Sequence, residues 1–189
     1  MKRALDVATC ALFVALFWPV LLAIIVAIKL HSPGKAIFAQ PRVGQNGRLF
    51  TCYKLRTMYS GTANLPTHQV QASAVTSLGE ILRRFKIDEL PQLWNVLLGD
   101  MSLVGPRPCL PSQTELVEAR KRLGVFAVRP GITGLAQVSG VDMSDANRLA
   151  EIDAQYVRTQ NFVGDLRLVW ATLRGQGVGV DQVVRSGNT

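Results

Sequence analysis

Two adjacent acids, Asp88 and Glu89, stand just before Pro91, a residue whose fixed φ suits a first helical turn. The free N–H groups and the dipole of a helix N-terminus favour negative charge, so both carboxylates are expected to stay ionised. An ionised carboxylate can ligate Mg²⁺ or, if it is aimed at phosphorus, act as a nucleophile. The pair is therefore a candidate source of a nucleophile or of a metal ligand, and the alternative for it is ordinary helix capping.

Several basic residues fall in predicted loops or at the ends of predicted elements, where they could converge on the acids and hold phosphate. They are Lys54, Arg56, Arg83, Arg84, Arg107 and Arg129. Taken singly, each arginine could equally be a surface ion pair of little energetic value. Arg120, Lys121 and Arg122 are expected to lie on a solvated helix face instead.

Arg107 and Arg129 are the most informative of these cations because of their neighbours. Arg107 lies between Pro106 and Pro108, whose rings restrict the backbone, so its guanidinium could meet a phosphate bidentately at low ordering cost. Arg129 precedes a Pro-Gly pair where the backbone could approach a ligand closely. Both loops are therefore candidate phosphate-binding elements.

The elements that position these residues are mostly helical. Two short extended stretches, 36–39 and 49–53, flank a Gly-Gln-Asn-Gly turn and predict a β-hairpin, while 60–76 has the composition of a mobile loop. Residues 129–134 are expected to form a loop. Helices are predicted over 78–85, from Pro91 to Gly99, over 113–123, from a Ser144 cap to about Arg158, and over 165–173. The fold class is α/β, mostly helical with a small hairpin.

Charge and cysteine content restrict the class of protein. The formal net charge is +8, which favours a phosphate-bearing partner: nucleic acid, anionic lipid or a phosphorylated small molecule. A nucleic-acid binder is disfavoured because there is no binding motif and few aromatics accompany the basic residues. The 3 cysteines form no Cys-x-x-Cys pair, so neither a disulfide framework nor a zinc site is indicated.

A membrane segment precedes the catalytic candidates. Residues 7–28 carry no charge, and as a helix they would be about 33 Å long, enough to match a bilayer core. Basic residues on both sides and Pro19 near the middle argue against a simple crossing. We expect a re-entrant helical hairpin over 1–31, broken near Pro19, with a kinked span as the alternative, and a cytosolic catalytic domain over 32–189. Residues 165–173 suit either a membrane-interface amphipathic helix or ordinary core packing.

Five strings of the sequence resemble a known family, the bacterial monotopic phosphoglycosyl transferases, also described as undecaprenyl-phosphate sugar phosphotransferases. They are Phe38-x-Gln40-x-Arg42-x-Gly44, Tyr53-Lys54-Leu55-Arg56-Thr57-Met58, the run from Asp88 to Val96, the run from Gly99 to Pro108, and the run from Arg129 to Gly140. They occur in family order over residues 1 to about 175, and the chain resembles the small catalytic-core form of the family.

The resemblance implies transfer of a sugar phosphate from a UDP-sugar to a polyprenyl phosphate, with release of UMP and a requirement for Mg²⁺. Asp88 would be the nucleophile that forms a covalent phosphosugar intermediate, and Glu89 its partner acid. The resemblance also carries Lys54, Arg107, Arg129 and Asp153 into the pocket, and it describes the N-terminal segment as a hairpin broken at Pro19. It implies the cytosolic face of a bacterial inner membrane, and it leaves a homodimer open.

The transferred sugar is not fixed by the sequence. N-acetylated hexosamines or their deoxy derivatives are one expectation and hexose 1-phosphate is the next. Ala74-Val75-Thr76 stands where many relatives carry a basic residue, so donor choice could differ here. The competing functional hypothesis is a non-catalytic protein that binds anionic lipid through its basic face.

Overall fold

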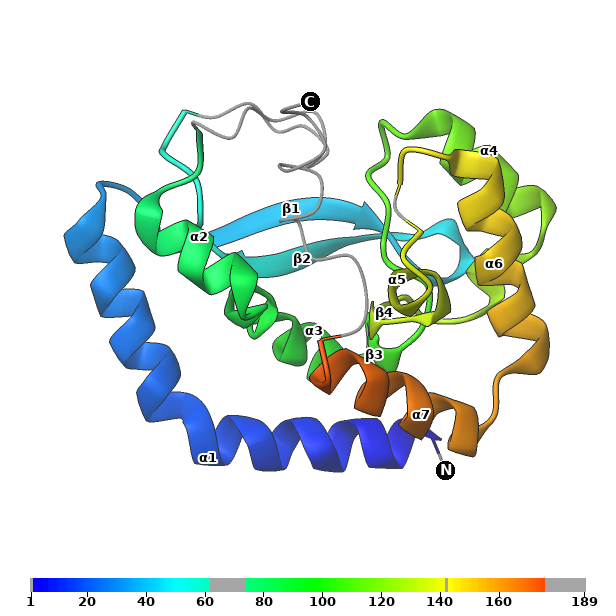
Figure 1. Ribbon diagram of the computed structural model, residues 1–189, viewed down its shortest axis with the longest axis horizontal. Helices are drawn as coiled ribbons and strands as arrows, with labels where there is room; N and C mark the ends of the chain where they lie inside the picture. Colours follow the sequence, from blue (N-terminus) through cyan, green and yellow to red (C-terminus); the bar gives the residue numbers. More distant parts are fainter. Residues whose placement is uncertain (1, 62–73, 142, 176–189) are drawn as a thin grey trace.

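The computed structural model describes residues 2–61, 74–141 and 143–175 (Figure 1). The strands are β1 (Ile37–Val43), β2 (Leu49–Leu55), β3 (Ser102–Val104) and β4 (Gly131–Thr133). The helices are α1 (Lys2–His31), α2 (Ser77–Arg84), α3 (Gln92–Leu98), α4 (Thr114–Arg122), α5 (Leu135–Val138), α6 (Ala146–Thr159) and α7 (Phe162–Leu173), with 3-10 turns at Gln45–Gly47, Ile87–Glu89 and Val125–Ala127. The mostly helical fold class with small sheets is confirmed.

The predicted β-hairpin is present. Strands β1 and β2 pair antiparallel from Ile37 opposite Leu55 to Val43 opposite Leu49. The connecting turn places Asn46 at φ 56°, a left-handed conformation that asparagine tolerates better than most residues. The hairpin carries Lys54 near its free end and Arg42 near its turn.

The expected loop over 129–134 is wrong in part, because residues 131–133 form β4. This strand pairs parallel with β3, with Ser102 opposite Gly131 and Val104 opposite Thr133. A Cβ added at Gly105 would lie 2.5 Å from the carbonyl oxygen of Arg129, so the two backbones meet more closely than side chains allow. Gly131, the glycine that suggested approach to a ligand, instead lies against this stretch, because a Cβ added at Gly131 would collide with the Gly105 nitrogen.

Most predicted helices are present with small shifts at their ends. The helix after Pro91 ends at Leu98, and Gly99 follows it at φ 98°, the left-handed position that glycine accommodates. The helix expected from a Ser144 cap starts at Ala146, and its capping side chain is Asp145, which accepts a hydrogen bond from the Arg148 amide at 3.0 Å. Of the loop predicted over 60–76, residues 62–73 lie outside the described residues.

The apolar N-terminal segment forms one continuous helix, α1, with Pro19 inside it. Helix α1 bends sharply between its two halves and runs along two sides of the molecule (Figure 1). A proline inside a helix removes one hydrogen bond and displaces the preceding turn, which accounts for the bend. The expected hairpin is therefore a bent helix rather than two helices separated by a break. Among the described residues, α1 is the one helix long and apolar enough to cross a membrane.

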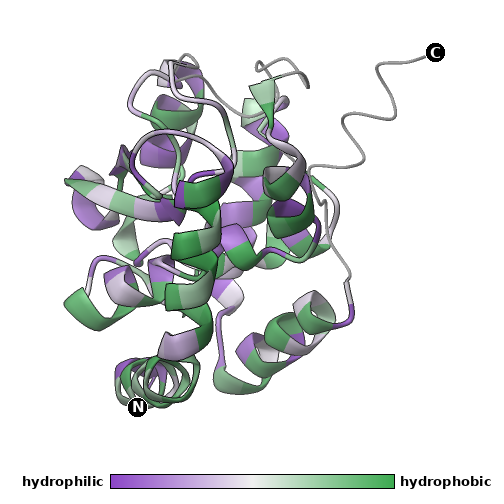
Figure 2. Cartoon of the chain, turned by 90° about the vertical axis from the view of Figure 1, so that its left-hand side faces the viewer, coloured by the Kyte–Doolittle hydropathy of each residue, from purple (hydrophilic) through white to green (hydrophobic). Residues whose placement is uncertain are grey.

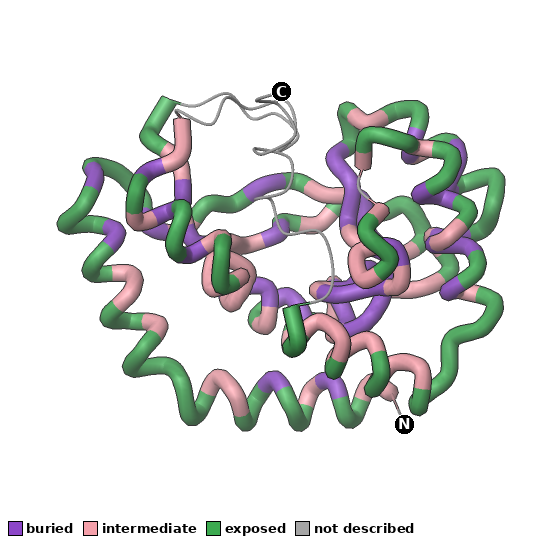
Figure 3. The backbone as a smooth tube through the Cα atoms, in the orientation of Figure 1, coloured by how far each residue is buried: buried purple, intermediate pink, exposed green. Residues whose placement is uncertain are grey.

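Both ends of α1 are fixed to the rest of the chain. Near its start, Arg3 donates to the carbonyls of Val96 (2.6 Å) and Leu97 (3.1 Å) at the end of α3. Near its end, Ile28 packs in a buried cluster with side chains of the hairpin and α2. The outer surface of α1 between these anchors is largely exposed (Figure 3). The helix therefore leaves the globular part and returns to it.

Helix α7 lies beside the N-terminal half of α1, and Lys2 of α1 forms an ion pair with Asp165 of α7. The two helices lie at the same edge of the molecule and both carry much apolar surface (Figure 2). Leu166, Trp170 and Leu173 of α7 are exposed, with Leu173 at 75%. The sequence left two interpretations of this helix, a membrane-interface helix or ordinary core packing. Core packing is wrong for these three side chains, because they are exposed. An exposed apolar helix face is typical of a surface that meets a membrane or another apolar partner.

Candidate active site

The acid pair sits in the short 3-10 turn Ile87–Glu89, between α2 and α3. Lys86 enters the turn at φ 57°. Pro91 then precedes α3, as the sequence predicted. The turn packs against β2, the strand that carries Lys54. This packing brings the two acids to the hairpin.

Glu89 is held by two cations. Its Oε1 accepts hydrogen bonds from Lys54 Nζ at 3.1 Å and from Arg107 Nη2 at 2.5 Å, and only 12% of its side chain is exposed. Burial opposes ionisation of Glu89, but the charges and hydrogen bonds of Arg107 and Lys54 more than offset it and hold the pKa of this carboxyl well below its usual range. Glu89 therefore stays ionised, as expected.

Asp88 has a different environment although it is the adjacent residue. Burial and the neighbouring Glu89 charge raise the pKa of Asp88 to about 6, against the opposing effect of Lys54, Arg83 and Arg107. Within the described part of the chain, no side chain forms an ion pair with its carboxylate. Burial and the like charge of Glu89 outweigh the helix end and the nearby cations, so the pKa of Asp88 lies above its usual value rather than below it. At pH 7 most Asp88 side chains are still ionised.

The structure brings Lys54, Arg83 and Arg107 together around the two acids, and we call these five residues the carboxylate cluster. Arg83 comes from the end of α2, and its Nε donates to Thr57 Oγ1 at 2.8 Å. Three cations around two acids leave a net positive charge, which suits a diphosphate. The cluster is built from three stretches of the sequence: Lys54 in β2, residues 83–89, and Arg107.

Three of the candidate arginines lie outside the cluster, and Arg84 among them has its guanidinium over the ring of Phe85. Arg56 donates to the carbonyls of Ile28, Ser32 and Pro33, so its guanidinium caps the C-terminal end of α1. Arg129 donates from Nε to the carbonyl of Gly99 at 2.8 Å, next to the end of α3. Among the described residues, neither Arg56 nor Arg129 is bonded to Asp88 or Glu89.

Asp153 is a buried partner of Arg120 and does not contact the acid pair. Its Oδ2 accepts from Arg120 Nε at 3.0 Å and from Nη2 at 2.6 Å. Burial raises the pKa of Asp153, and Arg120 counteracts this effect. The solvated position expected for Arg120 is wrong: its exposure is 1%. The sequence did not reveal that Arg120 is buried, because it lies in the basic run Arg120-Lys121-Arg122. The apolar spacing of Leu116 and Ala119 was the one signal of the buried face of α4.

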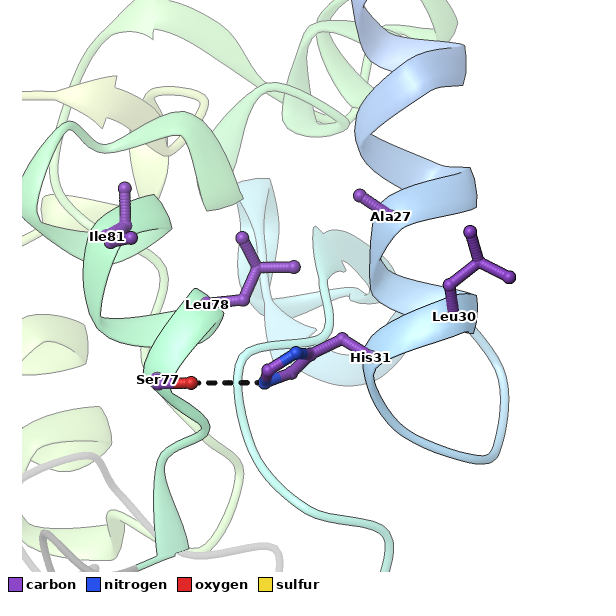
Figure 4. Close-up of a pocket in the computed structure, with 6 residues that line it drawn as sticks. All are labelled: Ala27, Leu30, His31, Ser77, Leu78 and Ile81. Atoms are coloured by element: carbon purple, nitrogen blue, oxygen red, sulfur yellow. Dashed lines mark hydrogen bonds between the residues drawn. The ribbon is translucent and has the colours of Figure 1, made fainter.

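An open groove lies between the end of α1 and α2 (Figure 4). It is lined mainly by apolar side chains of Ala27, Leu30, Leu78 and Ile81, and a 3.1 Å hydrogen bond joins His31 to Ser77 at one side. Ile81 is 55% exposed, whereas Leu82, the next residue, is buried. The groove thus runs along the outer face of the helix that carries Arg83.

The chain matches one family model and is similar to several known proteins, three of which are described here. The model of the family described as bacterial sugar transferase matches residues 1–176. A UDP-glucose:undecaprenyl-phosphate glucose-1-phosphate transferase of Caulobacter vibrioides is 45% identical, over 91% of this chain and 68% of its own length. A UDP-N-acetylgalactosamine-undecaprenyl-phosphate N-acetylgalactosaminephosphotransferase of Aeromonas hydrophila is 39% identical, over 92% and 43%. The exopolysaccharide production protein ExoY of Rhizobium meliloti is 36% identical, over 91% and 83%.

Proposed function

The chain belongs to the bacterial sugar transferase family, and on that premise we propose that it transfers a sugar 1-phosphate from a UDP-sugar to undecaprenyl phosphate. The names of two relatives support both substrates, since each describes a transferase that acts with a UDP-sugar and undecaprenyl phosphate. One name specifies glucose and the other N-acetylgalactosamine, so both sugar classes expected from the sequence occur among the relatives. The chain spans less than half of the second relative, and its own donor is part of the proposal.

The contrast between the two adjacent carboxylates carries the mechanistic part of the proposal. Glu89 is bonded to two cations, which leaves it little freedom to react. Asp88 has a raised pKa and no ion pair within the described chain, so its oxygens are available and comparatively basic. A carboxylate oxygen of Asp88 attacks the β-phosphorus, and the bond from that phosphorus to the bridging oxygen breaks. UMP leaves with the electron pair, and an aspartyl phosphosugar remains.

The second step returns Asp88 to its starting state. An oxygen of the lipid phosphate attacks the same phosphorus, the bond from Asp88 to phosphorus breaks, and the product is a sugar linked to the lipid through a diphosphate. Arg107, Lys54 and Arg83 would stabilise the phosphate oxygens in both steps. Splitting the reaction lets a water-soluble donor and a membrane-bound acceptor reach the site in turn.

A magnesium ion is part of the proposal. Within residues 2–61, 74–141 and 143–175, no group of three or more His, Cys, Asp or Glu side chains is arranged to hold a metal. Mg²⁺ usually binds through one or two carboxylates together with substrate phosphate oxygens, and Asp88 fits that mode of binding. When bound, the ion neutralises charge on the diphosphate and on the departing UMP.

We also infer that α1 enters the membrane and returns to the same, cytosolic, face. Support comes from the two anchors of α1, because both ends are bonded to one globular part of the chain. The N-terminus and the catalytic part then share a side of the bilayer, which agrees with the basic residues at both ends of the segment. Single cysteines at positions 4 and 30, in a variant lacking the native cysteines, should both react with an impermeant thiol reagent from the cytoplasmic side. Protection of position 4 alone would mean that α1 spans.

The proposed reaction is tested with detergent-solubilised protein, Mg²⁺ and a panel of UDP-sugars. We expect UMP release and an intact-mass increase equal to the phosphosugar with at least one donor. Asp88→Asn should lower UMP release at least about 10³-fold, since the amide is not a nucleophile. Glu80→Gln, which removes an exposed acid from α2, is the matched control and should retain activity. Unchanged UMP release in Asp88→Asn would refute the aspartyl route, and no release with any donor would favour the anionic-lipid-binding hypothesis.

A further inference from the structure

Each of the three carbonyl groups in the Pro106-Arg107-Pro108 segment accepts a hydrogen bond from another part of the chain. The three bonds are Gly131 N–H to Pro106 O at 2.9 Å, Arg120 Nη1 to Arg107 O at 2.8 Å, and Arg42 Nη1 to Pro108 O at 2.9 Å. Two of its residues are prolines and have no N–H to donate, so the carbonyls are the main means of fixing this backbone. On the other side, the Arg107 side chain reaches Glu89.

The donor to the Arg107 carbonyl is half of a buried ion pair. Arg120 of α4 and Asp153 of α6 are 1% and 2% exposed. Asp153 Oδ2 accepts hydrogen bonds from Nε and Nη2 of Arg120, and Nη1 of Arg120 donates to Arg107 O. The planar guanidinium thus joins two helices to the segment that carries Arg107.

Stability alone gives little reason for such a pair. Its surroundings are apolar, because Leu116, Ala119, Leu149 and Ala150 form the core between α4 and α6. Removing two charges from water is costly, and well-packed apolar residues at such places are often equally stabilising. What apolar residues could not supply is a donor for the Arg107 carbonyl.

We propose that Arg120, oriented by Asp153, is a positioning residue that holds the Arg107 guanidinium against Glu89 within the carboxylate cluster. The proposal rests on the proposed function, in which Arg107 acts on the transferred phosphate. Fixing the carbonyl of a residue between two prolines fixes where its side chain begins. Displacement of a charged group by about 1 Å at a reacting centre can cost on the order of 100-fold in rate.

Single-turnover formation of the phosphosugar adduct separates positioning from folding. The amplitude measures the fraction of active protein, and the rate constant measures the chemistry in that fraction. Arg120→Lys keeps a cation beside Asp153 but loses the forked guanidinium. We expect the rate constant to fall by up to about tenfold. Leu149→Ala is the matched control: it weakens the same core without touching Arg107, so amplitude and Tm should fall while the rate constant holds. A fall confined to amplitude and Tm in Arg120→Lys would overturn the proposal.

A double-variant cycle tests whether Arg120 acts through Arg107. In an Arg107→Ala background, Arg120→Lys should change the rate constant by less than about twofold, because the group it positions is gone. An equal factor in both backgrounds would overturn the proposal.

A readout independent of catalysis covers the case in which wild-type protein forms no adduct. That result would refute the aspartyl route but not the positioning role. The Nε–Hε NMR signal of Arg107, assigned by its loss in Arg107→Lys, should shift or broaden in Arg120→Lys and stay in place in Leu149→Ala. An unmoved Arg107 signal in Arg120→Lys would overturn the positioning role.

Discussion

The loops around Arg107 and Arg129 have similar sequences and different surroundings. Each places an arginine directly before a proline, with glycine nearby, and the backbones meet where Gly105 approaches the Arg129 carbonyl. Yet Arg107 reaches Glu89, whereas the Nε of Arg129 holds the carbonyl of Gly99 after α3. The proline restricts the backbone in both loops, but the direction of each side chain is set by the helices packed behind it.

Loss of the arginine is therefore expected to have different effects on function and stability in the two loops. Loss of Arg107 should act mainly on the reaction, since its guanidinium belongs to the carboxylate cluster. Loss of Arg129 should act mainly on the fold, since its bond secures the end of α3, the helix that follows the acid pair.

Of the variants in the two loops, Arg107→Ala is expected to have the largest effect. It removes a charged donor from the phosphate site and one of two cations from Glu89, and the rate of adduct formation should fall about 100- to 1000-fold. Arg107→Lys keeps the charge without the forked guanidinium, so its rate of adduct formation should lie between those of the wild-type protein and Arg107→Ala. The rate constant is measured in single turnover, with circular dichroism to confirm folding. A loss smaller than that of Arg129→Ala would break the comparison.

The pH profile should distinguish the loops next. With the pKa of Asp88 at about 6, the ionised fraction and the rate should fall about tenfold from pH 7 to pH 5. Arg107 opposes protonation of Asp88, so Arg107→Ala should move the acid limb to higher pH. Arg129 has no such effect on Asp88, and Arg129→Ala should leave the limb near pH 6. A limb near pH 4 in the wild-type protein would contradict the burial of Asp88.

The smallest effect on rate is expected for Arg129→Ala. Losing the charged hydrogen bond to Gly99 should cost about 1 to 3 kcal/mol of unfolding free energy, with a rate loss of only a few-fold. Thermal or denaturant unfolding measures the first quantity and single turnover the second. An unchanged Tm with a rate loss matching Arg107→Ala would mean that Arg129 acts on substrate.

The local features of this protein follow from its sequence. The hairpin, the end of α3 at Gly99, the apolar helix with its proline and the charge pattern all depend on residues within a few positions of one another. Turn residues, helix periodicity and proline geometry act over that range, which is why they can be recognised without a structure. The family motifs likewise identified the acid pair and two of its cations, Lys54 and Arg107, whereas Arg83 was recognised only as a basic residue at a predicted helix end.

Tertiary packing alone decided which charges meet. Glu89 and Lys54 are 35 residues apart, and Arg120 is 33 residues from Asp153 and 13 from Arg107. A basic residue on a helix has the same local signature whether it faces water or a buried carboxylate, so Arg120 resembled its solvated neighbours. Likewise, the raised pKa of Asp88 arises from burial and from charges on other segments. These contacts depend on how distant elements pack, and the free energy of a charge depends on that packing more than on its neighbours in the chain.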